Sequence, residues 1–78
     1  MYLIDKQITA ADNAFEESND LEGVTVSDSE GWETDGANRL LKRFSYWDEE
    51  TDGDDERSTF CVNFIPNTDK VKEAYVNW

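Results

Sequence analysis

The chain has 78 residues, of which 19 are Asp or Glu, seven are Lys or Arg and none is His, so its formal net charge is −12. A net charge of about 2–8 in magnitude is enough to keep a small domain in solution, and a larger surplus destabilises the compact state through self-repulsion. The composition therefore disfavours direct binding to nucleic acid, whose affinity depends on neutralised phosphates, and binding to anionic membrane surfaces.

The length predicts one acidic domain over residues 1–78 with a modest core. Three Trp, three Tyr and four Phe are too many for a disordered, solvating tail, so we expect a folded chain. Cys61 is the only Cys, which excludes an intramolecular disulfide, and its apolar neighbours Phe60 and Val62 predict a small buried hydrophobe. No apolar run is long enough for a membrane helix and no signal peptide is visible, so we expect a cytoplasmic protein.

The N-terminal third predicts one helix. The short apolar run Met1–Ile4 is compatible with an edge strand, and Thr9 is a candidate N-cap with Asp12 at the third helical position. Apolar residues at helical spacing then predict a helix over about residues 9–18: Ile8, Ala11, Ala14 and Phe15. Asn19-Asp20 and Gly23 end it.

The central part predicts an antiparallel meander of three strands near residues 24–33, 39–48 and 57–65. Asp35-Gly36 and Asp52-Gly53 are turn signals between these strands, because Gly accepts the positive φ of a tight hairpin turn. Alternation is clearest in the third strand, at Phe60, Val62 and Phe64.

The C-terminal segment predicts a second helix. Pro66 breaks the third strand, and Asn67 or Thr68 can serve as the N-cap of this helix. Four residues then stand at i, i+3, i+4 and i+7, which is one face of a helix: Val71, Ala74, Tyr75 and Trp78. The predicted fold class is α+β, with a small antiparallel sheet of three to four strands and a helix near each end.

The acids gather in blocks that predict a binding surface. Residues 7–38 contain nine acids and no Lys or Arg. Asp12, Glu16 and Asp20 would stack one helical turn apart, close to the spacing of successive backbone phosphates. We expect the partner-binding residues to come from this region and from the acidic tip between the second and third strands: Asp12, Glu16, Glu17, Asp20, Asp28, Glu30, Trp32, Glu33, Asp35, Asp52, Asp54, Asp55 and Glu56.

Two aromatic residues have two interpretations each. Trp32 lies in an acidic stretch and would either cover one end of the core, in phase with Val24 and Val26, or serve as an exposed anchor for a partner. Trp47, beside Asp48, has the same alternatives. The number of aromatic residues also leaves room for a homodimer interface.

No catalytic motif is present, and we expect a protein that is not an enzyme and needs no cofactor. There is no His, no Gly-rich phosphate loop and no partner that would activate Cys61. Residues 48–56 resemble a calcium loop only in part, because Thr59 stands at the twelfth position, where an EF-hand has a bidentate Glu. A solvated hairpin tip is the simpler interpretation, and weak divalent-cation binding is the alternative.

Small size, high negative charge, the two acid blocks and a compact α+β pattern resemble the small acidic inhibitors of phages and mobile elements: anti-CRISPR proteins, anti-restriction proteins and uracil-DNA glycosylase inhibitors. The resemblance is one of class and assigns no residue. It implies an inhibitor that mimics nucleic acid in the positively charged channel of a host defence protein, in the bacterial cytoplasm if the gene is carried by a phage. The alternative function is an acidic adaptor or regulatory module that binds a basic protein without mimicry.

Overall fold

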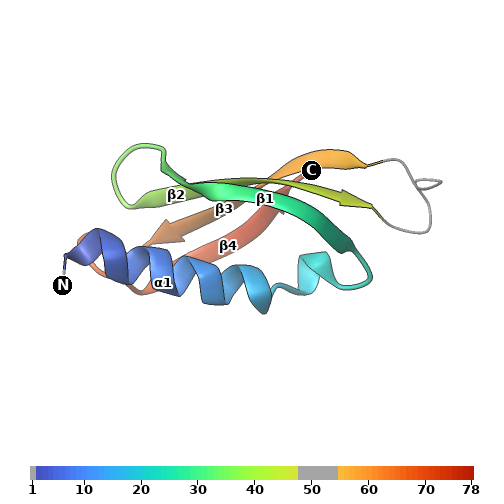
Figure 1. Cartoon of the computed structure of the whole chain (residues 1–78). Coiled ribbons are helices and arrows are strands. Elements are labelled where there is room, and N and C mark those ends of the chain that lie inside the picture. Colours follow the sequence, from blue (N-terminus) through green and yellow to red (C-terminus); the bar gives the residue numbers. More distant parts are fainter. Residues whose placement is uncertain (1, 48–54) are drawn as a thin grey trace.

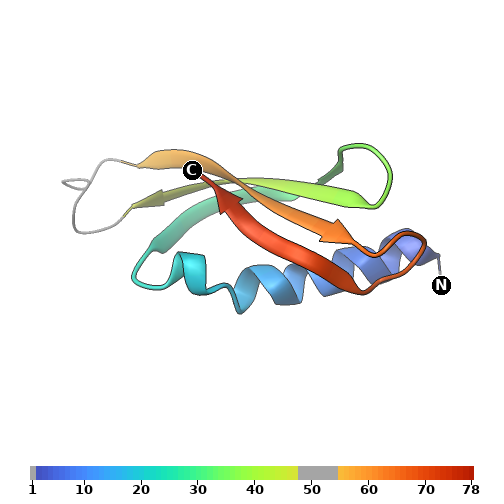
Figure 2. The same cartoon turned by 180° about the vertical axis from the view of Figure 1, so that it is seen from behind.

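The computed structural model describes residues 2–47 and 55–78. A single α-helix, α1 (Leu3–Glu16), is followed by the short 3-10 helix η1 (Asn19–Leu21) and four strands: β1 (Thr25–Thr34), β2 (Arg39–Trp47), β3 (Glu56–Phe64) and β4 (Val71–Asn77). The strands form one antiparallel sheet in the order β1-β2-β3-β4. α1 runs diagonally across one face of this sheet (Figures 1 and 2). The α+β class is confirmed.

The predicted meander is confirmed, and its strands begin and end within one residue of the expected positions. Gly36 has a φ of +80° in the turn between β1 and β2, as its place after Asp35 predicts. The second predicted turn, at Asp52-Gly53, lies outside the described residues. Alternation in β2 and β3 places Leu40 opposite Val62 on the face that α1 covers, and both side chains are buried.

The predicted start of the helix was wrong. α1 begins at Leu3, so Leu3 and Ile4 of the apolar run that was compatible with an edge strand belong to the first helical turn. Thr9 is no N-cap, since its hydroxyl donates to the Asp5 carbonyl within the helix, a contact of 3.1 Å. Ile4 and Ile8 extend the apolar spacing of Ala11 and Phe15 back toward the N-terminus, which is why the helix starts earlier.

The predicted C-terminal helix was wrong as well, because residues 71–77 form β4. Val76 pairs with Phe60 and is buried on the core face, and Ala74 pairs with Val62. The spacing that suggested a helix mixes residues from both faces of this strand. Asn67 and Thr68 belong to the β3–β4 turn instead: Asn67 has a φ of +62°, and the Thr68 hydroxyl donates to the Ile65 carbonyl at 2.7 Å.

The core is rich in aromatic side chains. Phe44 and Phe60 are fully buried, and the ring of Phe15 from α1 meets both edge-on, at centroid distances of 5.5 and 5.2 Å. Offset and edge-to-face pairs of this kind contribute about 0.5–1.5 kcal/mol each beyond the burial of area. Cys61 is buried, as predicted, although it faces the side of the sheet that α1 leaves uncovered.

α1 is tied to the far end of the chain. The Gln7 side chain is buried and its Nε2 donates to the carbonyl of Thr68 in the β3–β4 turn, at 2.9 Å. At the other end of the helix, η1 lies beside β4, where Asp20 accepts a hydrogen bond from the Val76 backbone N–H. These contacts place the segment between α1 and β1 at one end of the sheet.

Candidate protein-binding surface

Charge is segregated along the chain and therefore in space. Residues 2–35, which form α1, η1 and β1, contain ten acids and a single base, Lys6. The other six bases lie in β2, β3, β4 and the turn that precedes β4. Every acid in residues 2–35 is exposed. α1 and β1 both lie on the near side in Figure 1, but Glu33 of β1 lies on the uncovered face of the sheet and Glu30 reaches Arg57 on that face, so the acids of α1 and β1 point in different directions. We call the surface of residues 2–35 the acidic surface.

The predicted stack of three acids on one helix was wrong, because α1 ends at Glu16 and Asp20 lies in η1. Asp12 and Glu16 remain one helical turn apart, and Asp5 joins them on the same face at i, i+7 and i+11. Glu17 is the C-cap residue. Asp20 instead contacts β4, where its Oδ2 accepts from the Val76 N–H at 3.2 Å.

Trp32 covers the core, the first of its two interpretations. Its ring is half-buried and lies edge-on to Phe15 and Phe60, with centroid distances of 6.4 and 6.3 Å. Its Nε1 donates to Asp12 Oδ1 at 2.6 Å, which joins β1 to α1. The ammonium group of Lys42 lies 5.0 Å from the Trp32 ring centroid, in the geometry of a cation–π contact. Trp47, by contrast, is 40% exposed.

The predicted acids of β1 and of the turn after it follow the sheet edge, and two of them form ion pairs with arginines. Glu30 lies 3.4 Å from Arg57, and Asp35 lies 3.5 Å from Arg39. Asp28 accepts from the backbone N–H of Ser29 at 2.9 Å. Glu33 has no ion pair to any described residue and pairs in register with Leu41, on the uncovered face of the sheet. The β1 acids are thus partly compensated, unlike those of α1.

The acidic tip between β2 and β3 can be described only from Asp55 onward. Asp55 Oδ2 accepts from the Ser27 hydroxyl at 3.1 Å, and Glu56 Oε2 accepts from the Tyr46 hydroxyl at 3.0 Å. Asp52 and Asp54 lie outside the described residues, as does most of the partial calcium-loop match. Within residues 2–47 and 55–78, no group of three metal-ligating side chains is close enough to hold an ion.

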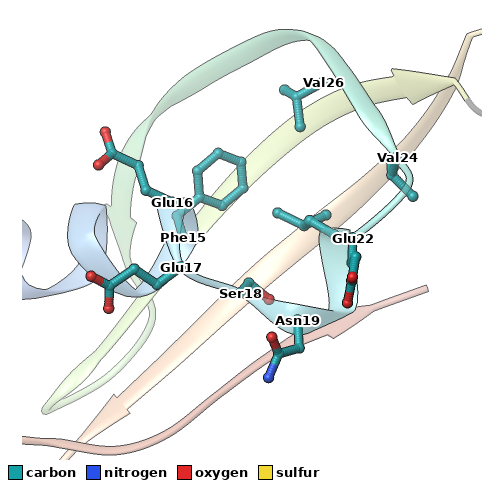
Figure 3. Close-up of a pocket in the computed structure, with 9 residues that line it drawn as sticks. Phe15, Glu16, Glu17, Ser18, Asn19, Glu22, Val24 and Val26 are labelled. Atoms are coloured by element: carbon teal, nitrogen blue, oxygen red, sulfur yellow. The ribbon is translucent and has the colours of Figure 1, made fainter.

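A hollow of about 480 Å³ opens where α1, η1 and β1 meet. Its apolar lining comes from Phe15, Leu21, Val24 and Val26, and polar residues border it: Glu16, Glu17, Ser18, Asn19 and Glu22. Figure 3 shows the carboxylates of Glu16 and Glu17 on one side of Phe15 and that of Glu22 on the other. Sequence reasoning missed Glu22 as a site residue, because its neighbours across the hollow come from the end of α1.

The uncovered face of the sheet carries bases as well as acids. All three arginines of the chain, Arg39, Arg43 and Arg57, lie on it. Arg39 contacts the Cys61 sulfur at 3.8 Å and the Tyr75 hydroxyl at 3.4 Å. The contact with Cys61 raises the pKa of Arg39 above its ordinary value, although desolvation by burial opposes this. The arginines offset part of the negative charge that Glu30 and Glu33 bring to this face.

No family model, curated protein or solved structure matches the chain. No helix among the described residues is long and apolar enough to span a bilayer. The case for a function therefore rests on the surface itself.

Proposed function

We propose that the protein is a binding inhibitor of a nucleic-acid-binding protein, of the anti-CRISPR or anti-restriction type. Its acidic surface would occupy a positively charged channel and exclude the nucleic acid that the channel normally holds. The observation that supports this proposal is the concentration of ten exposed acids and one base in residues 2–35. The protein itself would not catalyse a reaction, would need no cofactor and would bind neither nucleic acid nor membrane directly.

The acids divide into those with a structural partner and those without one. Asp12, Asp20 and Asp35 each bind another part of the fold. Glu16, Glu17, Glu22 and Glu33 have no ion pair among the described residues. Carboxylates without an internal partner keep their full charge available to another molecule. We therefore assign these four the main role in partner binding and give Asp12 and Asp20 a mainly structural one.

The charge of this surface favours a partner shaped to bind nucleic acid. Opposite potentials steer association and raise its rate by orders of magnitude at low salt, whereas charge pairs at the rim of an interface add little affinity each. Removing one acid should therefore have a small effect, and reversing several together a large one. We also expect the affinity for the partner to fall strongly as the salt concentration rises.

The experiment is a low-salt pull-down from a bacterial lysate with the whole chain as bait. Captured proteins are eluted first with sodium phosphate and then with duplex DNA at the same total phosphate concentration, and each eluate is identified by mass spectrometry. We expect a nucleic-acid-binding protein in the DNA eluate only. A partner that DNA cannot displace would overturn mimicry and favour an acidic adaptor.

Two charge-reversed baits separate the acidic surface from net charge. The first changes Glu16 and Glu22 to Lys. The second changes Asp69 and Glu73 to Lys, which alters the net charge equally but lies outside both the acidic surface and the acidic tip. We expect the first bait to lose the partner and the second to retain it, with both folded by circular dichroism. Equal capture by the two baits would contradict the assignment.

A further inference from the structure

The hollow between α1, η1 and β1 differs from the rest of the acidic surface because it is apolar inside. Phe15, Leu21, Val24 and Val26 line it, and all four are half-buried rather than closed off from solvent. Leu21 and Val24 are held together at its base, where the Val24 N–H donates to the Leu21 carbonyl at 3.1 Å. A purely electrostatic mimic has no need for such an apolar recess.

The border of the hollow carries three carboxylates on two sides. Glu16 and Glu17 project from the end of α1, and Glu22 projects from the connection that follows η1 (Figure 3). None of the three is paired with a base among the described residues, and all are exposed. The carboxylates of Glu16 and Glu17 point away from Val24 and Val26 in Figure 3, so a cation entering the hollow would meet Glu22 beside the apolar floor and the charge of the two α1 acids at the outer border.

From this geometry we infer that the hollow binds one arginine side chain of the partner protein. This inference rests on the proposed function and names the group that the acidic surface captures. Arginine has the required two-part chemistry: an aliphatic stem that packs on apolar surface and a planar guanidinium that binds carboxylates and stacks on aromatic rings. Arginines are also abundant in nucleic-acid channels, where they bind phosphate in the same bidentate manner.

The arginine stem would pack on Val24 and Val26 and the guanidinium would bind Glu22, while Glu16 and Glu17 would add attraction from the border of the hollow. A buried arginine anchor of this type is a common hot spot in protein interfaces. The hollow would thus add a specific contact to a surface that otherwise attracts any basic partner. Val24, Val26 and Glu22 would matter for affinity, and the more distant acids for the rate of association.

The test needs no knowledge of the partner. N-acetyl-arginine N-methylamide is titrated into the whole chain, and the methyl signals of Leu21, Val24 and Val26 are followed by NMR. The uncharged isostere N-acetyl-citrulline N-methylamide is the reference ligand. We expect saturable shifts with the arginine probe, with a Kd on the order of 1–10 mM, and none with the citrulline probe over the same range.

Two variants with the same change in net charge locate the site. Glu16→Gln, Glu17→Gln and Glu22→Gln together remove the carboxylates at the hollow, and we expect the Kd to rise at least about tenfold. Asp5→Asn, Asp69→Asn and Glu73→Gln together remove three acids that do not line the hollow, and the Kd should change by less than about twofold.

Equal shifts with the two probes, or equal weakening in the two variants, would overturn the inference. Because this titration involves no partner, its failure would leave the mimicry experiment unaffected. Conversely, a partner that DNA cannot displace would overturn mimicry even if the hollow bound the arginine probe.

Discussion

The Asp20 carboxylate accepts a hydrogen bond from the Val76 backbone N–H at 3.2 Å, across 56 positions of sequence. β4 is an edge strand, and the N–H of Val76 points away from β3, its neighbour in the described sheet. Unpaired edge groups are templates for pairing with another chain. The Asp20 carboxylate therefore pairs with a backbone N–H of this edge and keeps it from pairing with another chain. An acid that was predicted to bind a partner thus has a structural role.

Removing that carboxylate should destabilise the fold. We expect Asp20→Ala to lower the free energy of unfolding by about 1 kcal/mol, since the Val76 N–H loses its acceptor. Urea denaturation followed by circular dichroism measures the change. Glu22→Ala is the matched control, because it removes a neighbouring acid that has no ion pair among the described residues, and its effect should stay within about 0.5 kcal/mol. Equal losses in the two variants would contradict a specific Asp20–Val76 bond.

The hydrogen bond between Trp32 and Asp12 should be measurable as a coupling. Trp32→Phe keeps most of the packing against Phe15 and Phe60 but removes the Nε1 donor, and Asp12→Ala removes the acceptor. In a double-mutant cycle we expect a coupling free energy of about 1 kcal/mol. Additive single effects would show that the 2.6 Å contact contributes nothing to stability in solution.

Salt should stabilise this protein. Like charges dominate residues 2–35, whereas the two ion pairs of the described residues are largely exposed and should each contribute roughly 0–1 kcal/mol. Raising NaCl from about 10 mM to about 1 M shortens the Debye length from about 30 to about 3 Å and so screens the repulsion. We expect the Tm to rise, by about 4–8 °C for each kcal/mol gained. A fall in Tm would mean that attractive pairs outweigh repulsion.

Strand β4 can be verified with one pair of equivalent substitutions. Ala74 pairs with Val62 in the sheet and is exposed, so Ala74→Val should be neutral or stabilising by up to about 1 kcal/mol. Ala10→Val places the same β-branched side chain within α1, where it should destabilise by about 0.5 kcal/mol or more. Thermal unfolding gives both values. If Ala74→Val destabilises as Ala10→Val does, residues 71–77 are not the strand described here.

The meander could be predicted because its signals are local. Alternation at Phe60, Val62 and Phe64 and the Asp35-Gly36 turn depend on neighbouring residues only. The C-terminal strand could not be predicted in this way. Val71, Ala74 and Tyr75 fit a helical stripe, whereas Ala74 and Val76 fit a strand equally well. Strand β3 decides between a helix and a strand for residues 71–77. Its backbone N–H and C=O groups on the side away from β2 gain hydrogen-bond partners when residues 71–77 pair with it as a strand.

The negative charge of the candidate site could be predicted from the sequence, but the tertiary contacts of its acids and the hollow could not. The shortage of bases before Arg39 is visible in the sequence and places the acids on the first elements of the fold. That Asp12 binds Trp32, and that Asp20 binds β4, depends on tertiary contacts between distant segments. The hollow escaped prediction for the same reason, since Phe15 and Val26 come together only when α1 packs on the sheet.

The connectivity of the sheet also bears on the order in which the molecule assembles. Each strand pairs only with its neighbours in sequence, so the hairpins can form from local contacts, which generally form fast. α1 and η1 contribute no such local pairing: Gln7 of α1 and Asp20 of η1 contact residues near the other end of the chain. We therefore expect the charged N-terminal segment to dock late, onto a sheet that is already formed, and the hollow to exist only after that final step.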